Sequence, residues 1–400
     1  MTIAREATGR PQGIPFWRDV RKIGLIIQAA SAILTLGALA FLFTTAVQSM
    51  AARGIPFTFA FLFEEAGFSI SEGSILTLEG GRLTWRPFTA RDTYLSAFYA
   101  GLLNTLRVAV IGIVLASILG VVVGVARLSS NWLVNRLSFA FVELVRNTPL
   151  LLQMFFWYFA VFLKLPGARE ASVWYGGLMV SNQGAYLPWP EATGSVLPFL
   201  LVMAGALAAS LVAYLATRAS GKGPWFGLGA LLAVGAGGMA LTGVPFELSY
   251  PELGRFRITG GTNLSPEFTA VLLGLVIYTS AFIAEVIRGA IQSVPRGQRE
   301  AALSLGLTGG QTMRLVVLPQ AFRIVIPPVG NLYLSLMKNT SLAVAVGYPD
   351  LFNVYRTVGN QSGRSLEGVL IVMAVYLALS LAISALVNAY NRRVTTRWGL

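Results

Sequence analysis

Long apolar runs alternate with polar intervals along almost the whole chain. About twenty apolar residues in a row can cross the hydrocarbon core of a bilayer as a helix. Eight runs of roughly this length predict membrane-spanning helices at 23–47, 98–126, 139–163, 195–217, 225–243, 267–291, 320–345 and 366–390. The pattern therefore predicts an all-α integral membrane protein.

The polar intervals predict how the rest of the chain is organised. Residues 1–22 and 393–400 flank the outermost spans. Residues 48–97 contain turn formers and strand-like alternation, as in Gly80-Gly81-Arg82-Leu83-Thr84-Trp85, which predicts a small cap between the first two spans. Residues 164–266 combine two spans with loops rich in Gly, Pro and aromatic side chains.

The composition supports a membrane protein and excludes several kinds of chemistry. Of the 400 residues, 55% are hydrophobic and only 12% are charged, and the mean hydropathy is +0.67. The absence of cysteine excludes disulfides and thiolate metal sites, and the absence of histidine removes the usual general base. The first run exceeds the apolar core of about 7–15 residues in a signal peptide, so we expect a retained anchor.

The distribution of charge predicts the topology. The net charge of +13 does not indicate nucleic-acid binding, because the basic residues are scattered between apolar runs. If the amino terminus is cytoplasmic, most of the 30 Lys and Arg residues fall in inner loops and most of the 17 Asp and Glu residues in outer ones. Because basic residues favour cytoplasmic loops, both termini and the interval 293–319 are predicted to lie in the cytoplasm.

The interval 293–319 carries local signals for two short helices separated by a corner. Pro295 suits the first turn of a helix, and helix formers follow it. Gly306 stands where a left-handed residue ends a helix. Thr308 and Gln311 then form a capping-box pattern for a second helix, which Pro319 is expected to close. We expect both helices to lie across the membrane face.

Small and charged side chains meet in the first of these helices. Arg299, Glu300, Ala301 and Ala302 would form a narrow, polar-edged knob that can seat in the groove of a partner protein. The alternative is an ordinary amphipathic surface helix.

Several charged residues lie in or at the edges of the spans. A charge at the centre of a lone helix costs about 2.5–3.5 kcal/mol on insertion scales, so such residues usually face a partner or a wet cavity. Glu285 and Arg288 share a helix face and are expected to pair, as are Glu143 and Arg146. We interpret these four and Lys338 as gating or scaffold groups, and Arg107 also lies within a span.

Two glycines in the second span predict a close helix contact. Gly120 and Gly124 are four residues apart and leave a groove on one face of the helix. Such a step lets a neighbouring helix approach closely, although apolar runs often contain one by chance.

Four segments carry specific motifs. The first three are Asn104-Thr105-Leu106 with Gly124-Val-Ala-Arg127, then Glu143-Leu-Val-Arg146-Asn147-Thr148-Pro149-Leu150-Leu-Leu-Gln153, and Tyr278-Thr-Ser-Ala-Phe-Ile-Ala-Glu285-Val-Ile-Arg288-Gly289. The fourth is Lys338-Asn339-Thr340-Ser341-Leu342, followed by Gly347-Tyr-Pro-Asp350-Leu351. With Glu300-Ala301-Ala302 and Gly306, which stand at the spacing of the EAA loop, these motifs resemble the polar amino-acid permease family of ABC importers.

The resemblance implies a membrane subunit that does not hydrolyse ATP. It implies a five-helix type I importer core at 98–163 and 267–392, to which this chain adds an N-terminal span and a two-span insertion, like the larger permeases of general L-amino-acid systems. Arg299, Glu300, Ala301, Ala302 and Gly306 would couple the chain to a separate ABC ATPase dimer, which binds ATP and Mg. The other implied partners are a second homologous permease chain and a periplasmic amino-acid-binding protein, in a bacterial inner membrane.

An amino-acid pathway needs hydroxyls, amides and open backbone near the middle of the bilayer. The candidates for this chemistry are Gln153, Tyr278, Ser280, Asn339, Thr340 and Ser341. Pro327, Pro328 and Gly330 are expected to break the seventh span and to free carbonyls near the pathway. The alternative is that these side chains satisfy the backbone of their own helices.

Two other functions compete with an importer subunit. A secondary transporter or channel would work without an ATPase, but such proteins usually show paired repeats or an intramembrane carboxylate relay, and neither is visible. A membrane enzyme would have to work without histidine or cysteine. The ATPase is expected on another chain, because no G-x-x-x-x-G-K-[ST] motif occurs.

Overall fold

The computed structural model of the chain describes residues 20–79, 82–192, 197–217, 223–243, 246–254 and 258–397. Within these residues, seven helices are long and apolar enough to cross a membrane. They are α1 (Val20–Ala52), α2 (Tyr94–Ala126), α5 (Leu197–Thr217), α6 (Gly223–Thr242), α7 (Pro266–Ser293), α10 (Leu318–Asn339) and α12 (Ser365–Arg397). The predicted segments 1–19 and 398–400 lie outside the described residues.

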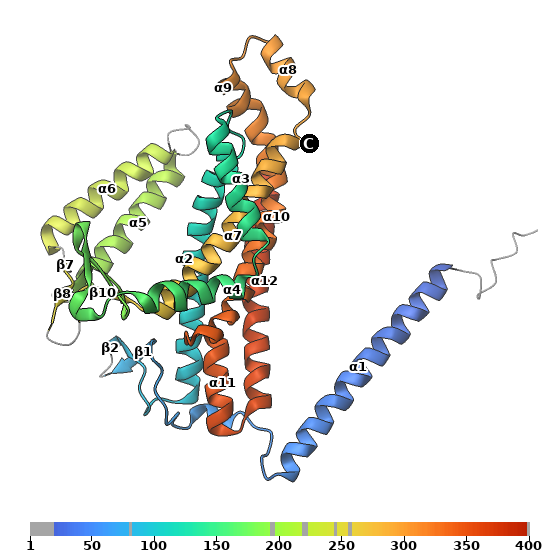
Figure 1. Cartoon of the computed structure of the whole chain (residues 1–400), viewed down its shortest axis with the longest axis vertical. Coiled ribbons are helices and arrows are strands. Elements are labelled where there is room, and N and C mark those ends of the chain that lie inside the picture. The colour runs from blue at the N-terminus through green and yellow to red at the C-terminus, as the bar shows by residue number, and fades with distance from the viewer. Residues whose placement is uncertain are drawn as a thin grey trace, which may run out of the picture.

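The central bundle consists of α2, α7, α10 and α12, with the shorter α11 (Leu351–Ser362) at one end (Figure 1). Its interior is apolar, and side chains such as Leu275, Ile283 and Leu336 are almost completely buried. The close helix contact expected at Gly120 and Gly124 is confirmed between α2 and α7. A Cβ atom at Gly124 would lie 2.9 Å from the carbonyl oxygen of Ala284.

The third expected span is not one helix. It consists of α3 (Trp132–Arg146), α4 (Leu150–Phe155) and a π-helical turn at Phe156–Val161. The break falls at Pro149, which has no N–H to donate and disfavours helical backbone at Thr148. In Figure 1, α3 runs along the bundle and α4 turns off across it.

The prediction that the seventh span is broken is wrong. α10 runs without interruption from Leu318 to Asn339, through Pro327 and Pro328. Both proline rings are exposed, so they displace no packed neighbour. Gly330, one turn later, lies against Val387 of α12, and a Cβ atom there would be 2.5 Å from Val387 Cγ1. Packing against adjacent helices keeps a proline-containing membrane helix together.

The interval before α2 folds onto the end of the bundle. β1 (Ser74–Glu79) and β2 (Arg82–Pro87) form an antiparallel hairpin with Leu76 opposite Trp85, as the alternation predicts. A 3₁₀ turn at Ala60–Phe63 precedes it. Buried aromatic side chains from this cap, among them Phe61 and Phe68, pack with residues of α2, α11 and α12.

The insertion between α4 and α7 contains short strands and a helical hairpin. The strands are β3 (Ser172–Trp174), β4 (Leu178–Ser181), β5 (Gly184–Leu187), β6 (Trp189–Ala192), β7 (Phe246–Ser249), β8 (Glu252–Leu253), β9 (Ile258–Thr259) and β10 (Thr262–Leu264). They form a four-stranded sheet in the order β10-β5-β4-β3 and the two-stranded pairs β6-β7 and β8-β9. α5 and α6 pack on each other beside the bundle (Figure 1).

α1 stands apart from the bundle (Figure 1), and its membrane-length window has no buried residue. Its connection to the bundle is nevertheless specific. The backbone N–H of Thr58 donates to Glu367 Oε1 at 3.1 Å, and Arg364 of the loop before α12 donates to the carbonyl oxygen of Pro56. Glu367 is fully buried and also pairs with Arg364. The base of α1 is therefore pinned to the start of α12.

Candidate coupling and translocation site

The loop at 293–319 begins with the expected helix and corner. α8 (Arg296–Ser304) follows Pro295, and Gly306 adopts a left-handed φ of 81°. The N–H of Gly306 donates to the Leu303 carbonyl at 2.9 Å, and that of Leu307 donates to the Ala302 carbonyl at 3.2 Å. These two bonds form a Schellman motif, which satisfies the last carbonyls of α8. The predicted corner at Gly306 is confirmed.

The second helix begins as predicted but does not end at Pro319. α9 (Gly309–Thr312) starts with a complete capping box between Thr308 and Gln311. A π-helical turn at Met313–Val317 then leads directly into α10, and Pro319 lies in the first turn of that helix. Proline is tolerated there because the first N–H groups of a helix need no partner within it. From α9 onward, the second half of the loop and α10 are thus one continuous helical segment.

The exposed surface of α8 extends beyond the predicted knob. Glu300 and Ala301 are exposed, whereas Ala302 is buried. Arg299 donates from Nη2 to the carbonyl oxygen of Ile291 at 2.8 Å, which ties α8 to the end of α7. The following residues, Leu303 and Leu305, are 53% and 83% exposed.

Leu303 and Leu305 were missed by the sequence reasoning. The sequence does contain a signal for them. Two leucines that are two positions apart near the end of a helix cannot both lie on its buried face, so at least one is expected to be exposed. An exposed apolar side chain at the tip of a loop is a natural contact for another protein.

The inner ends of α2 and α7 are joined by a charge cluster. Glu285 of α7 forms ion pairs with Arg288 on the same helix, as expected, and with Arg127 at the end of α2. Arg127 also lies 5.2 Å from the ring centre of Phe139 in α3. Because Glu285 joins α7 to α2 and Arg127 reaches α3, the cluster holds the inner end of the bundle together.

The expected pair between Glu143 and Arg146 does not form among the described residues. Glu143 instead accepts a long hydrogen bond of 3.4 Å from Asn147. The guanidinium of Arg146 lies over the ring of Phe282 in α7, 5.3 Å from its centre. α3 ends at Arg146, so its side chain reaches α7 and not back along its own helix.

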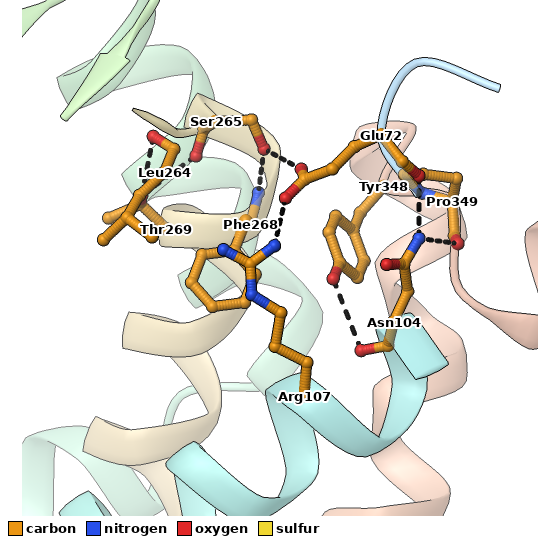
Figure 2. Close-up of polar contacts among 9 residues, drawn as sticks. All are labelled: Glu72, Asn104, Arg107, Leu264, Ser265, Phe268, Thr269, Tyr348 and Pro349. Atoms are coloured by element: carbon orange, nitrogen blue, oxygen red, sulfur yellow. Dashed lines mark hydrogen bonds and ion pairs between the residues drawn. The ribbon is translucent and has the colours of Figure 1, made fainter. Parts of the chain in front are cut away.

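The charge of Arg107 is neutralised from outside its span (Figure 2). Arg107 Nη1 lies 2.5 Å from Glu72 Oε1 of the cap, and its guanidinium lies 4.3 Å from the ring centre of Phe268. The other oxygen of Glu72 accepts a 2.6 Å hydrogen bond from Ser265 Oγ. Ser265 is in turn the N-cap of α7, accepting from the N–H of Phe268. Glu72 therefore joins α2 to the start of α7.

Asn104 extends this outer cluster to the loop before α11 (Figure 2). Its Nδ2 donates to the carbonyl oxygens of Glu72, at 2.8 Å, and Pro349, at 2.9 Å. The hydroxyl of Tyr348 donates to the Asn104 carbonyl at 3.3 Å. The cap, α2, α7 and the loop at 347–350 are thus linked by buried or half-buried polar contacts.

Three of the expected pathway residues are already used by the fold. Ser280 and Thr340 are buried and donate to the carbonyl oxygens of Ile277 and Met337, both at 2.8 Å. Gln153 is buried and donates to the carbonyls of Val145 and Thr148, both at 3.0 Å. Its amide thereby satisfies carbonyls that the break at Pro149 leaves free.

The other candidates remain accessible on the described surface, as does Lys338, which was predicted as a gating or scaffold charge. Lys338 is exposed, and Asn339 and Ser341 are half-buried beside it. Ser341 donates to the Lys338 carbonyl at 2.8 Å. Tyr278 is half-buried and packs on Phe282, with ring centres 4.9 Å apart. These residues come from the end of α10 and from α7.

A buried polar network around Asp350 was also missed. Asp350 is fully buried, caps α11 through the N–H of Asn353 at 2.9 Å, and accepts a 3.4 Å contact from the hydroxyl of Tyr376. The same hydroxyl lies 3.3 Å from Thr340 Oγ1. Burial raises the pKa of the Asp350 carboxyl to about 6. No local pattern pairs these residues, because they come from separate elements.

Comparisons with known proteins agree on one class. Residues 112–396 match the family described as "Binding-protein-dependent transport system inner membrane component". The chain is 43% identical over 377 residues to the putative amino-acid ABC transporter permease protein YhdX of Escherichia coli K12, covering 92% of this chain and 93% of that protein. It is 39% identical to the general L-amino acid transport system permease protein AapQ of Rhizobium johnstonii, covering 84% and 83%.

Two further comparisons extend this set. The glutamate/glutamine/aspartate/asparagine transport system permease protein BztB of Rhodobacter capsulatus is 38% identical, with 94% of each chain covered. Among solved structures, an amino acid ABC transporter with histidines aligns with a TM-score of 0.47 at 22% identity, covering 75% of this chain and 95% of that one.

Proposed function

The chain belongs to the family of binding-protein-dependent transport system inner membrane components, and we propose on this premise that it is the membrane permease of an ATP-driven importer of L-amino acids. Relatives aligned over most of their length are named as amino-acid permeases. The chain would form the translocation pathway and hydrolyse nothing. Its place is the inner membrane of a bacterium, with both termini in the cytoplasm.

The observation that carries this proposal is the exposed surface of α8. An apolar tip at Leu305, beside Glu300 and Ala301, offers a compact contact for a separate ATPase. Since α9 continues through the π-helical turn into α10, a displacement at α8 passes directly into the bundle. Arg299 would transmit it to α7 as well, through its bond to Ile291. The end of α12 lies at the same end of the molecule as α8 and α9 (Figure 1).

We propose three kinds of partner. An ABC ATPase dimer that binds ATP and Mg would contact Glu300, Ala301 and Gly306, with Arg299 at the edge, while the buried Ala302 would hold α8 in place. A second homologous permease would complete the pathway, and a periplasmic amino-acid-binding protein would deliver the cargo to the cap and the insertion.

The accessible polar residues at the end of α10 support a pathway between two permease chains. Lys338, Asn339 and Ser341 lie at the surface of this chain, so a partner could cover them without unfolding it. Together with Tyr278 they offer a cation, an amide and hydroxyls, which suit the carboxylate and ammonium shared by all amino acids. Such a site reads the common groups of the substrate and favours broad specificity.

The coupling assignment is tested by uptake of labelled amino acids into proteoliposomes that contain the complete complex. We expect Glu300→Lys and Gly306→Pro each to reduce ATP-dependent uptake at least tenfold, because proline cannot adopt the positive φ of Gly306. Arg136→Gln, at an exposed position of α3 outside the coupling loop and the cap, is the control. Normal uptake by both coupling variants, or uptake by this chain without an ATPase, contradicts the proposal.

Contact with the ATPase can be tested separately, since the native chain has no cysteine. Ala301→Cys is expected to form a cross-link to the ATPase with a short bifunctional reagent, whereas Glu65→Cys is not. Equal cross-linking at both positions would count against the contact.

A further inference from the structure

A groove of about 580 Å³ runs between α2, α7, α10 and α12, in the half of the bundle next to the coupling loop. Its walls are formed by aliphatic and aromatic side chains from all four helices. Representative residues are Val121, Val125, Ile287, Val325, Val387 and Tyr390. Val121 and Leu386 are 48% and 71% exposed, so the groove opens sideways out of the bundle.

The chemistry of the groove does not suit an amino acid. Ser117 and Tyr333 are its polar members at the end away from the coupling loop, and they are bonded to each other at 2.8 Å. Ser117 also donates to the Ile113 carbonyl at 2.6 Å. A carboxylate and an ammonium placed there would lose their hydration without gaining partners, which costs several kcal/mol. The occupant must be apolar.

The length and position of the groove match one leaflet of a bilayer. It follows α2 from Ile113 to Val125, which spans about 18 Å at 1.5 Å per residue. Half of a hydrocarbon core of about 30 Å is 15 Å. The groove begins at the last turn of α2 and at Leu318, the first residue of α10, so it lies in the leaflet on the side of the coupling loop.

Basic residues surround the mouth of the groove at this end. Arg314 is exposed and precedes Leu318 by one turn, and Arg392 is exposed and follows Tyr390 by two residues. Of the acidic residues at this end, Glu285 is held by Arg127 and Arg288, and Glu300 is exposed on the same helix as Arg296 and Arg299, so basic residues remain in excess. The excess positive charge at the membrane surface attracts anionic lipid phosphates.

We propose that this groove is a phospholipid site, with one acyl chain lying between α2 and α10 and the phosphate near Arg314 and Arg392. A lipid meets both observations at once, an apolar groove one leaflet long and a basic rim at its surface end. A helix of a second permease chain would also be apolar, but it would extend through both leaflets and would not require the rim. The inference does not depend on which substrate the chain carries.

The test uses the full-length protein, with its co-purifying subunits, extracted in mild detergent and analysed by native mass spectrometry for bound phosphatidylglycerol. Val121→Trp fills the groove from α2, and Val122→Trp is the matched control, 59% exposed on the same helix and outside the groove. We expect Val121→Trp to lower phospholipid occupancy at least tenfold and Val122→Trp to leave it unchanged. Equal occupancy in both variants overturns the proposal.

A second pair of variants tests the same groove from another helix, so the result does not depend on whether Val121→Trp folds normally. Leu386→Trp on α12 lines the groove, and Leu381→Trp on the same helix, 61% exposed, does not. Replacing Arg314 by Gln should weaken phosphatidylglycerol binding several-fold with little effect on an uncharged diacylglycerol. Disulfide formation between Val125→Cys and a cysteine in a second permease chain would instead identify a protein as the occupant and overturn the lipid site.

Discussion

Arg107 shows how a charge inside a membrane span can be satisfied by a distant part of the chain. Its partner, Glu72, lies 35 positions earlier in the cap and also holds the N-cap of α7 through Ser265. The sequence places Arg107 in an apolar run but contains no local signal for this contact. The ion pair depends on the fold of the whole cap.

We expect Glu72→Gln to destabilise the protein by about 1–3 kcal/mol, because it removes one partner of a partly buried pair. The measurement is the midpoint of thermal unfolding in detergent. Glu65→Gln, an exposed cap residue, is the control. If the ion pair is responsible, the double variant Glu72→Gln/Arg107→Gln is destabilised by less than the sum of the losses in the two single variants.

A second cap residue predicts a dependence on pH. Hydrogen bonds from Arg86 and Thr89 lower the pKa of Asp92 to about 2. A depressed pKa in the folded state contributes stability above the unfolded value of about 4, and this stability is lost as pH falls from about 4 to 2. The difference in melting temperature between the native protein and Asp92→Asn should therefore be large at pH 7 and shrink at pH 3. A constant difference would contradict the assignment.

For the pathway candidates, residue type alone does not predict whether a polar side chain is available to a substrate. Ser280, Thr340 and Gln153 have the chemistry of a substrate site, yet their hydrogen bonds are used by their own helices. Asn339 carries a similar signal and remains accessible. Which of two polar side chains faces its own backbone is decided by tertiary packing, so composition and spacing do not separate them.

At the scale of elements, local signals predicted the ends of helices better than their continuity. Gly306 and Thr308 mark a corner and a helix start by interactions within a few residues, and both are observed. The prolines at 149 and 327–328 have the same local effect, but only Pro149 interrupts a helix. The difference lies in the neighbours, because α10 is held along its length by α7 and α12.

The contact between α2 and α7 gives a prediction with a matched control on one helix. Gly124→Ala is expected to destabilise the bundle by about 1–3 kcal/mol, since its Cβ would press on the backbone oxygen of Ala284. Gly112→Ala introduces its Cβ at 3.5 Å from Leu336, an ordinary contact, and gains about 1 kcal/mol of helix propensity. The midpoint of thermal unfolding should fall for Gly124→Ala and rise for Gly112→Ala. Equal shifts in the two variants would contradict the close packing at Gly124.

At the scale of the whole molecule, we predict that the bundle folds without the helical hairpin α5–α6. The hairpin enters and leaves through paired strands, with Ala192 directly opposite Phe246. Replacing residues 193–245 by Asn-Gly would close β6 and β7 with a two-residue turn. We expect this variant to reach the membrane and to cross-link through Ala301→Cys as the full chain does. Loss of membrane insertion would show that the hairpin is part of the folding unit.

The pin at the base of α1 sets an order of events during synthesis. Thr58 and Glu367 are 309 positions apart, and Arg364 reaches Pro56 over a similar distance. At about 5–20 residues per second, a ribosome needs about 15–60 s to make the chain between them. During that time α1 lacks the contacts of its connecting segment with Arg364 and Glu367. Its own apolar length must keep it in the bilayer, and its final angle is set only when nearly the whole chain has been made.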